Sequence, residues 1–209
     1  MNNQPLKHLA TLAITLLSLL GSSVAFSSDI EGDIEAGRSK AVVCNHCHKD
    51  NNDSSIPKIA GQHENYLVKQ MFAYRDGQRK DKIMETVISR LKSHNDIYDL
   101  AAYYANLPKV LDINLAKQKN PLGHEVFENK IRCYQCHGAK GDGNPLAKPI
   151  IPSIAGQNKD YIVKRLMEFQ SQNSRHSQSS PMSEIAKQLD IVDIFSVSEY
   201  VSDMQPEEP

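Results

Sequence analysis

All four cysteines of this 209-residue chain lie in two copies of one five-residue motif. The copies span Cys44–His48 and Cys133–His137, and both read C-x-x-C-H. Two cysteines three residues apart on one helical turn reach the two vinyl groups of one porphyrin, and the histidine that follows is carried under the iron. The motifs therefore predict two covalently bound haem c groups, each with its own iron.

Each motif assigns a role to three of its residues. Both cysteines form thioethers to the haem, and the histidine becomes the proximal ligand of the iron. The predicted attachment residues are Cys44, Cys47, Cys133 and Cys136, and the predicted proximal ligands are His48 and His137.

Three other readings of the cysteines explain less of the pattern. Two disulfides are the usual expectation for four cysteines in an exported chain. A C-x-x-C redox pair belongs in a βαβ context and needs no histidine. A zinc site made from all four cysteines requires the pairs to converge across about 85 residues. None of these readings uses His48 and His137, so covalent haem is the preferred prediction.

The chain is also a tandem repeat. Pro57–Lys69 recurs as Pro152–Lys164, and both copies contain Pro-x-Ile-Ala-Gly-Gln. Further on, Asp96–Tyr103 recurs as Asp193–Tyr200. Each copy follows its C-x-x-C-H motif with these segments in the same order. We therefore predict one domain over residues 26–108, a proline-bracketed linker over 109–121 and a second domain over 122–209.

The apolar periodicity predicts an all-α fold. Glu35–Cys47, Asn65–Tyr74 and Asp96–Asn106 each place apolar residues on one helical face, and the second copy repeats the last of these. Alternating strand patterns are absent from the sequence. Each repeat is too small and too poor in aromatic residues to build a large core alone, so we expect it to wrap its apolar haem.

The repeat also selects the sixth ligand of each iron. Met84 lies 12 residues before Asp96, and Met182 lies 11 residues before Asp193, so both fall in the loop ahead of the terminal helix. Met71 and Met167 have no methionine at the matching position of the other copy, which favours a role as core filler. We predict Met84 and Met182 as axial ligands. The remaining histidines lack such partners and are not expected to bind iron: His63, His94, His124 and His176.

The N-terminus predicts export. Lys7 leads into the apolar run Leu9–Leu20, and Ser23 and Ala25 supply the small residues that a signal peptidase needs. We expect export with cleavage after Ala25; the alternative is an uncleaved membrane anchor, for which the run is short. Without residues 1–25 the chain has 23 basic and 25 acidic residues, which excludes a basic nucleic-acid footprint.

The whole mature chain resembles cytochrome c4, a periplasmic protein made of two class I cytochrome c domains with one haem each. The resemblance rests on both C-x-x-C-H motifs, the repeated Pro-x-Ile-Ala-Gly-Gln, the helix Asp96–Ala105 and the segment Cys136–Pro145. It implies the same ligand pairs, His48 with Met84 and His137 with Met182. It also implies that the carbonyls of Pro57 and Pro152 orient the proximal imidazoles, and that Gly37 is a helix-crossing point.

The resemblance further implies electron transfer without net chemistry. An iron with two protein ligands has no open position for a small-molecule substrate, so we expect redox proteins as partners. The expected partners are a quinol-oxidising complex and a terminal oxidase, docked transiently at the membrane over a small interface. The alternatives are an electron-accepting subunit of a dehydrogenase, such as flavocytochrome sulfide dehydrogenase, and a di-haem enzyme with one open iron.

Overall fold

The computed structural model describes residues 31–49, 53–109, 120–173 and 175–205. Over these ranges the chain is helical, and its only extended pairing is an isolated antiparallel bridge between Asn144 and Ile151. This confirms the all-α prediction. The predicted signal peptide and nearly all of the predicted linker lie outside the described residues, so their boundaries stay predictions.

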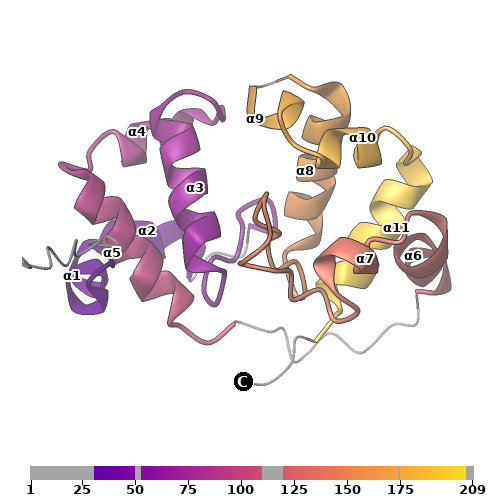
Figure 1. Ribbon diagram of the computed structural model, residues 1–209, viewed down its shortest axis with the longest axis horizontal. Helices are drawn as coiled ribbons and strands as arrows, with labels where there is room; N and C mark the ends of the chain where they lie inside the picture. Colours follow the sequence, from indigo (N-terminus) through magenta and orange to yellow (C-terminus); the bar gives the residue numbers. More distant parts are fainter. Residues whose placement is uncertain (1–30, 50–52, 110–119, 174, 206–209) are drawn as a thin grey trace, which may run out of the picture.

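The helices form two units, which repeat the same order of elements (Figure 1). The first unit contains α1 (Ile34–Lys40), α2 (Val42–His48), α3 (Glu64–Arg75), α4 (Lys82–Ile88) and α5 (His94–Ala105). The second unit contains α6 (Pro121–Glu125), a π-helical turn η1 (Val126–Lys130), α7 (Tyr134–His137), α8 (Lys159–Ser171), α9 (Arg175–Gln178), α10 (Met182–Ala186) and α11 (Ile191–Ser202). The longest described helix, α8, has 13 residues, and no described helix has the length and apolarity to span a bilayer.

The predicted helices are present, with one break. The segment predicted as a single helix over Glu35–Cys47 is divided at Ala41 into α1 and α2. The division separates two tasks, because α1 packs on α5 while α2 carries the first C-x-x-C-H motif. The terminal helices α5 and α11 both begin with a capping box, from Ser93 and Asp190 respectively.

In each unit the first helix crosses the last at a glycine. A methyl group on Gly37 of α1 would overlap the backbone carbonyl of Asp99 in α5. A methyl group on Gly123 of α6 would likewise overlap the backbone carbonyl of Ser196 in α11. The crossing that the family resemblance implied at Gly37 is therefore confirmed, and the second unit repeats it.

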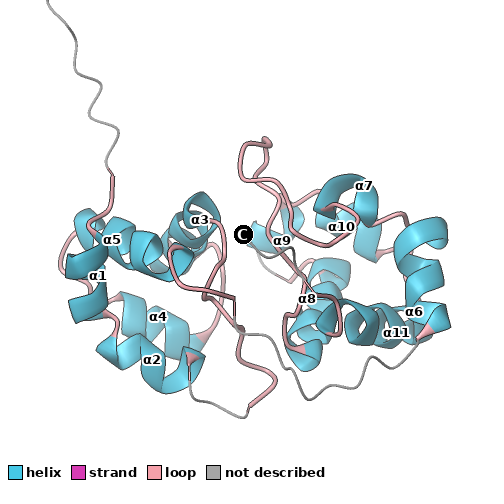
Figure 2. Ribbon diagram, turned by 90° about the horizontal axis from the view of Figure 1, so that it is seen from below, coloured by secondary structure: helices cyan, strands magenta, loops and turns pink. Residues whose placement is uncertain are grey.

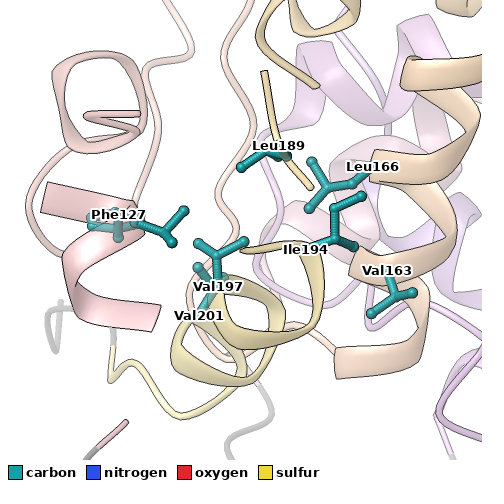
Figure 3. Close-up of a cluster of buried hydrophobic side chains, with 8 residues drawn as sticks. Phe127, Val163, Leu166, Leu189, Ile194, Val197 and Val201 are labelled. Carbon is teal, nitrogen blue, oxygen red and sulfur yellow. The ribbon is translucent and has the colours of Figure 1, made fainter. Parts of the chain in front are cut away.

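Each unit has a small apolar core that extends to its cysteine motif. In the first unit the core includes Leu67 of α3 and Leu100 of α5, and Cys44 packs against it. In the second unit Cys133 and Met182 both pack against the core drawn in Figure 3. The buried residues of that core are Val126, Phe127, Val163, Leu166, Leu189, Ile194, Val197 and Val201.

In each unit a lysine near the N-terminal end, on α1 or on η1, pairs with an aspartate of the last helix. Lys40 Nζ lies 2.8 Å from Asp96, and Lys130 Nζ lies 2.5 Å from Asp193. Asp193 is 3% exposed, and burial alone raises its pKa. Hydrogen bonds from Lys130 and the Asp190 backbone outweigh burial, so the pKa of Asp193 lies below its ordinary value.

This ion pair predicts an acid-sensitive contribution to stability. The carboxyl of Asp193 has a lower pKa in the folded chain than the value near 3.9 of an unfolded chain, so the unfolded state takes up the proton first. The stabilisation is therefore complete above about pH 4 and is lost as the pH falls through the folded pKa. We expect Asp193→Asn to lower the free energy of unfolding at pH 7, and the difference from the parent to shrink toward pH 3. Denaturant titrations across this range measure it; an equal difference at pH 3 and pH 7 would contradict it, and Asp76→Asn is the exposed control.

The two units are clamped together by two glutamines of the repeated Gly-Gln pair. Gln62 of the first unit accepts from Ser153 N (3.0 Å) and donates to Ser153 O (2.8 Å). Gln157 of the second unit makes the same two bonds to Lys58, both at 2.8 Å. The exchange is reciprocal, so each unit contributes one side chain and one backbone segment. In Figure 1 α3 and α8 face each other across this boundary, and Figure 2 shows the two units side by side from below.

We expect Gln62→Ala to separate the unfolding of the two units. The substitution leaves the Ser153 backbone N–H and C=O without their partners, which costs about 1–3 kcal/mol for a buried group. Calorimetry of the di-haem protein should then resolve two transitions or a broadened one. Gln188→Ala, at an exposed glutamine that bonds only within its own unit, is the matched control. A single sharp transition at the parent temperature would show that the clamp does not couple the units.

Candidate haem-binding sites

Both motifs adopt the helical turn that haem attachment needs. Cys44, Cys47 and His48 lie within α2. In the second unit α7 begins directly after Cys133, which serves as its N-cap, and α7 ends at His137 because Gly138 adopts a positive φ of 80°. All four cysteines are described, and none of them forms a disulfide.

The proximal histidines are buried and oriented by proline carbonyls. His48 Nδ1 lies 2.9 Å from the carbonyl oxygen of Pro57, and His137 Nδ1 lies 3.1 Å from that of Pro152. A carbonyl only accepts, so both imidazoles carry their proton on Nδ1 and leave Nε2 free as a ligand. This confirms the orientation that the resemblance implied.

Burial sets the protonation of the site. It lowers the pKa of both histidines, and the hydrogen bonds to the prolines offset this only in part, which favours the neutral imidazole that binds iron. Burial also raises the pKa of Cys44, and it raises that of Cys133 to about 11.

The predicted methionine ligands lie on short helices, which corrects the expectation of a loop. Met84 is the third residue of α4, whose N-cap Asp81 accepts from the backbone N–H of Ile83 and Met84. Met182 is the first residue of α10 and follows Pro181. Both methionines are partly buried, and Met182 touches the same core as Cys133. The assignment of Met84 and Met182 as iron ligands stays a prediction, while their helical conformation follows from Asp81 as N-cap of α4 and Pro181 before α10.

The other methionines and histidines occupy structural positions. Met71 packs against the first core, as a core filler does, while Met167 is 36% exposed on α8. His63 Nε2 lies 2.8 Å from the carbonyl of Asp142 in the other unit. His94 and His124 stack edge-on against Phe72 and Tyr200. Within the described residues, no three His, Cys, Asp or Glu side chains gather closely enough to hold a metal ion.

The residues present fit a haem in each unit. In each unit a pair of cysteines and an available histidine Nε2 share one turn. Met182 packs against the second core, and Met84 lies partly buried on α4. One buried guanidinium nitrogen at the boundary, Nη2 of Arg165, has no acceptor. A haem carries two propionate carboxylates, which such a donor suits.

Four residues at the boundary between the units were not predicted from the sequence. Gln62 and Gln157 recur in both copies, but this recurrence alone does not show that each bonds to the other unit. Arg165 gave no signal, because it replaces the Gln70 of the first copy. Arg79 is buried and donates to Gln70 and to Tyr161 of the other unit.

Known proteins of the same build share this arrangement. No family model matches the chain. A cytochrome c4 from Pseudomonas aeruginosa is 34% identical over 200 residues, covering 91% of this chain and 96% of the relative. A cytochrome c4 from Azotobacter vinelandii is 31% identical over 205 residues, covering 90% and 96%.

The chain belongs to the cytochrome c4 family. The crystal structure of reduced cytochrome c4 from Pseudomonas stutzeri superposes with a TM-score of 0.71 at 30% identity, over 83% of this chain and all of that one. This cytochrome therefore has two class I cytochrome c domains and two covalently bound haems, and it is an electron carrier rather than an enzyme. A thiosulfate dehydrogenase from Marichromatium purpuratum shares the fold at 23% identity and a TM-score of 0.69.

Proposed function

We propose that this cytochrome carries single electrons in the periplasm, from a quinol-oxidising complex to a terminal oxidase. In this proposal the first haem is attached through Cys44 and Cys47, with His48 and Met84 on its iron. The second is attached through Cys133 and Cys136, with His137 and Met182 on its iron. The paired contacts of His48 and His137 with proline carbonyls carry the proposal, because they prepare one iron ligand in each unit.

The chain's own residues hold the proposed sites rigid. Once bound, each iron supplies reversible one-electron chemistry between its ferrous and ferric states. The Pro57–Lys58 peptide group accepts from His48 through its carbonyl and donates to Gln157 through its N–H. One rigid peptide thus links a proximal imidazole of the first unit to a side chain of the second. Such fixed polar groups limit rearrangement when the charge on the site changes.

Export supports the periplasmic part of the proposal. The apolar run Leu9–Leu20 and the small residues before residue 26 are the signals on which it rests. We propose cleavage after Ala25, and the mass of the purified exported protein tests this. A mass that corresponds to the chain without residues 1–25 and with two haems would support both export and haem attachment. A mass that still includes residues 1–25 would indicate an anchored form.

An optical redox titration, repeated under carbon monoxide, tests the electron-carrier proposal. Two haems per chain that titrate at high potential and bind no carbon monoxide would agree with methionine and histidine on both irons. One low-potential haem, or one that binds carbon monoxide, would overturn the ligand assignment and favour an open iron site.

A second candidate is a dedicated acceptor for one dehydrogenase. A protein named thiosulfate dehydrogenase electron acceptor, from Stutzerimonas stutzeri, is 24% identical over 180 residues and is covered over 82% of its length. A carrier and a dedicated acceptor share the same haem sites, so the two differ in partner alone. Stopped-flow reduction of the purified cytochrome by a purified quinol-oxidising complex and by a thiosulfate dehydrogenase distinguishes them. Faster reduction by the dehydrogenase would favour the acceptor role.

A further inference from the structure

Two buried arginines meet at the boundary between the units. Arg79 follows α3, and its guanidinium lies 4.7 Å from the ring centroid of Tyr74 while Nη2 donates to Tyr161 at 3.0 Å. Arg165 lies on α8, the helix that faces α3 (Figure 1). Both arginines are 7% exposed, which is rare for a charged side chain.

Arg165 has an unused donor. Its Nη1 pairs with Glu168 one turn along α8, and its guanidinium stacks 4.6 Å above the ring of Phe169. Its Nη2 is buried and has no hydrogen-bond partner. A buried charged donor without a hydrogen-bond partner destabilises the fold. A carboxylate is the most suitable acceptor, because a guanidinium can donate two parallel hydrogen bonds to it.

The charges around Arg165 also call for an anion. Within the described residues the ion pairs give Arg165 a single carboxylate, Glu168, and give Arg79 none. Burial, together with Arg165, Arg79 and Lys69, lowers the pKa of the nearby His176 to about 3, so the histidine stays neutral beside these cations. The cluster therefore has an excess of positive charge on two buried guanidinium groups.

The position of Arg165 on α8 points to the second haem. Its neighbour Leu166 and the nearby Val163 belong to the core against which Cys133 and Met182 pack. Arg165 thus lies between that core and the unit boundary. The matching residue of the first unit is Gln70, which is neutral and is occupied as an acceptor of Arg79.

We propose that Arg165 binds a propionate carboxylate of the second haem through Nη2 and raises the reduction potential of that haem. A fixed cation beside the haem favours the ferrous form, which carries one positive charge fewer than the ferric form. Arg165 is a positioning and tuning residue, and it gives the second site a charge that the first site lacks. The inference rests on the proposed attachment of that haem at Cys133 and Cys136.

The test compares midpoint potentials in the complete di-haem protein. Arg165→Gln installs the residue of the first unit. We expect it to shift the redox equilibrium of the second haem about tenfold toward the ferric form, which corresponds to a fall of about 59 mV for one electron. The first haem should titrate as in the parent. Arg165→Lys keeps the charge without the planar fork, so it should restore part of the potential.

Lys159→Gln is the matched control, because it removes the same charge from a partly exposed position at the start of α8, where the lysine pairs with Glu199 of its own unit. We expect the control to leave both potentials unchanged. If it lowers the second potential as much as Arg165→Gln does, or if both Arg165 variants titrate as the parent, the inference is wrong. If Arg165→Gln does not fold, the midpoint potential of the second haem in Arg165→Lys tests the inference, and a potential equal to that of the parent would contradict it. The number of haems per chain, measured by absorbance, distinguishes a failure of this inference from a failure of the proposed haem attachment. A parent protein with one haem per chain would refute the attachment at the second motif.

Discussion

Replacing Met182 with leucine is expected to lower the midpoint potential of the second haem and to let its ferrous iron bind carbon monoxide. Leucine keeps the apolar volume against the second core but removes the sulfur ligand. Methionine raises the potential of a haem, and axial ligands together set potentials over about 0.8 V. We expect a fall on the order of 0.1 V, together with a carbon monoxide adduct on half of the haems.

Two further variants make the measurement specific. Met167→Leu changes a methionine on α8 that is 36% exposed, and it should affect neither the potential nor carbon monoxide binding. Met84→Leu should reproduce the effect on the other haem, so the pair of variants assigns the two steps of the titration. If Met182→Leu titrates as the parent and excludes carbon monoxide, another side chain is the ligand and the repeat-based assignment fails.

The haem motifs, the repeat and the all-α fold were predictable because each is a local signal. C-x-x-C-H is complete within five residues, and helical periodicity within about three turns. The terminal helices α5 and α11 also carry their own caps, so their predicted positions agree with the structure to within a few residues. The division of the first helix at Ala41 had no comparable local signal, since neither glycine nor proline marks it.

The contacts between the units were not predictable, because they join residues about 80 to 100 positions apart in the sequence. Gln62 and Gln157 recur at matching positions, yet recurrence fits a turn within each unit as well as an exchange between units. Only the folded chain shows the exchange, in which Gln62 bonds Ser153 and Gln157 bonds Lys58. Each of these two partners directly follows a proline whose carbonyl orients the proximal histidine of its unit. Arg165 was harder still, because the feature that matters is an unpaired buried nitrogen, and burial is a property of the fold.

Replacing Gly37 with alanine is expected to destabilise the first unit strongly, although alanine is the better helix former. At a solvent-exposed position of a helix, replacing glycine with alanine stabilises the helix by about 1 kcal/mol. Here the added methyl group would overlap the carbonyl of Asp99, which belongs to the backbone of α5 and has no rotamer by which to move away. Separating α1 from α5 costs about 3 kcal/mol, the upper end of the range for overpacking. The net effect should therefore have the opposite sign to helix propensity.

Denaturant unfolding followed by circular dichroism and by haem absorbance measures this effect. Ser39→Ala, an exposed substitution on the same helix, should change the free energy of unfolding by less than about 0.5 kcal/mol. Gly123→Ala should have the same effect on the second unit, because its methyl group would meet the carbonyl of Ser196. A Gly37→Ala protein more stable than the parent would mean that α1 and α5 separate at little cost. The close crossing would then not be what fixes α2, and with it His48, in place.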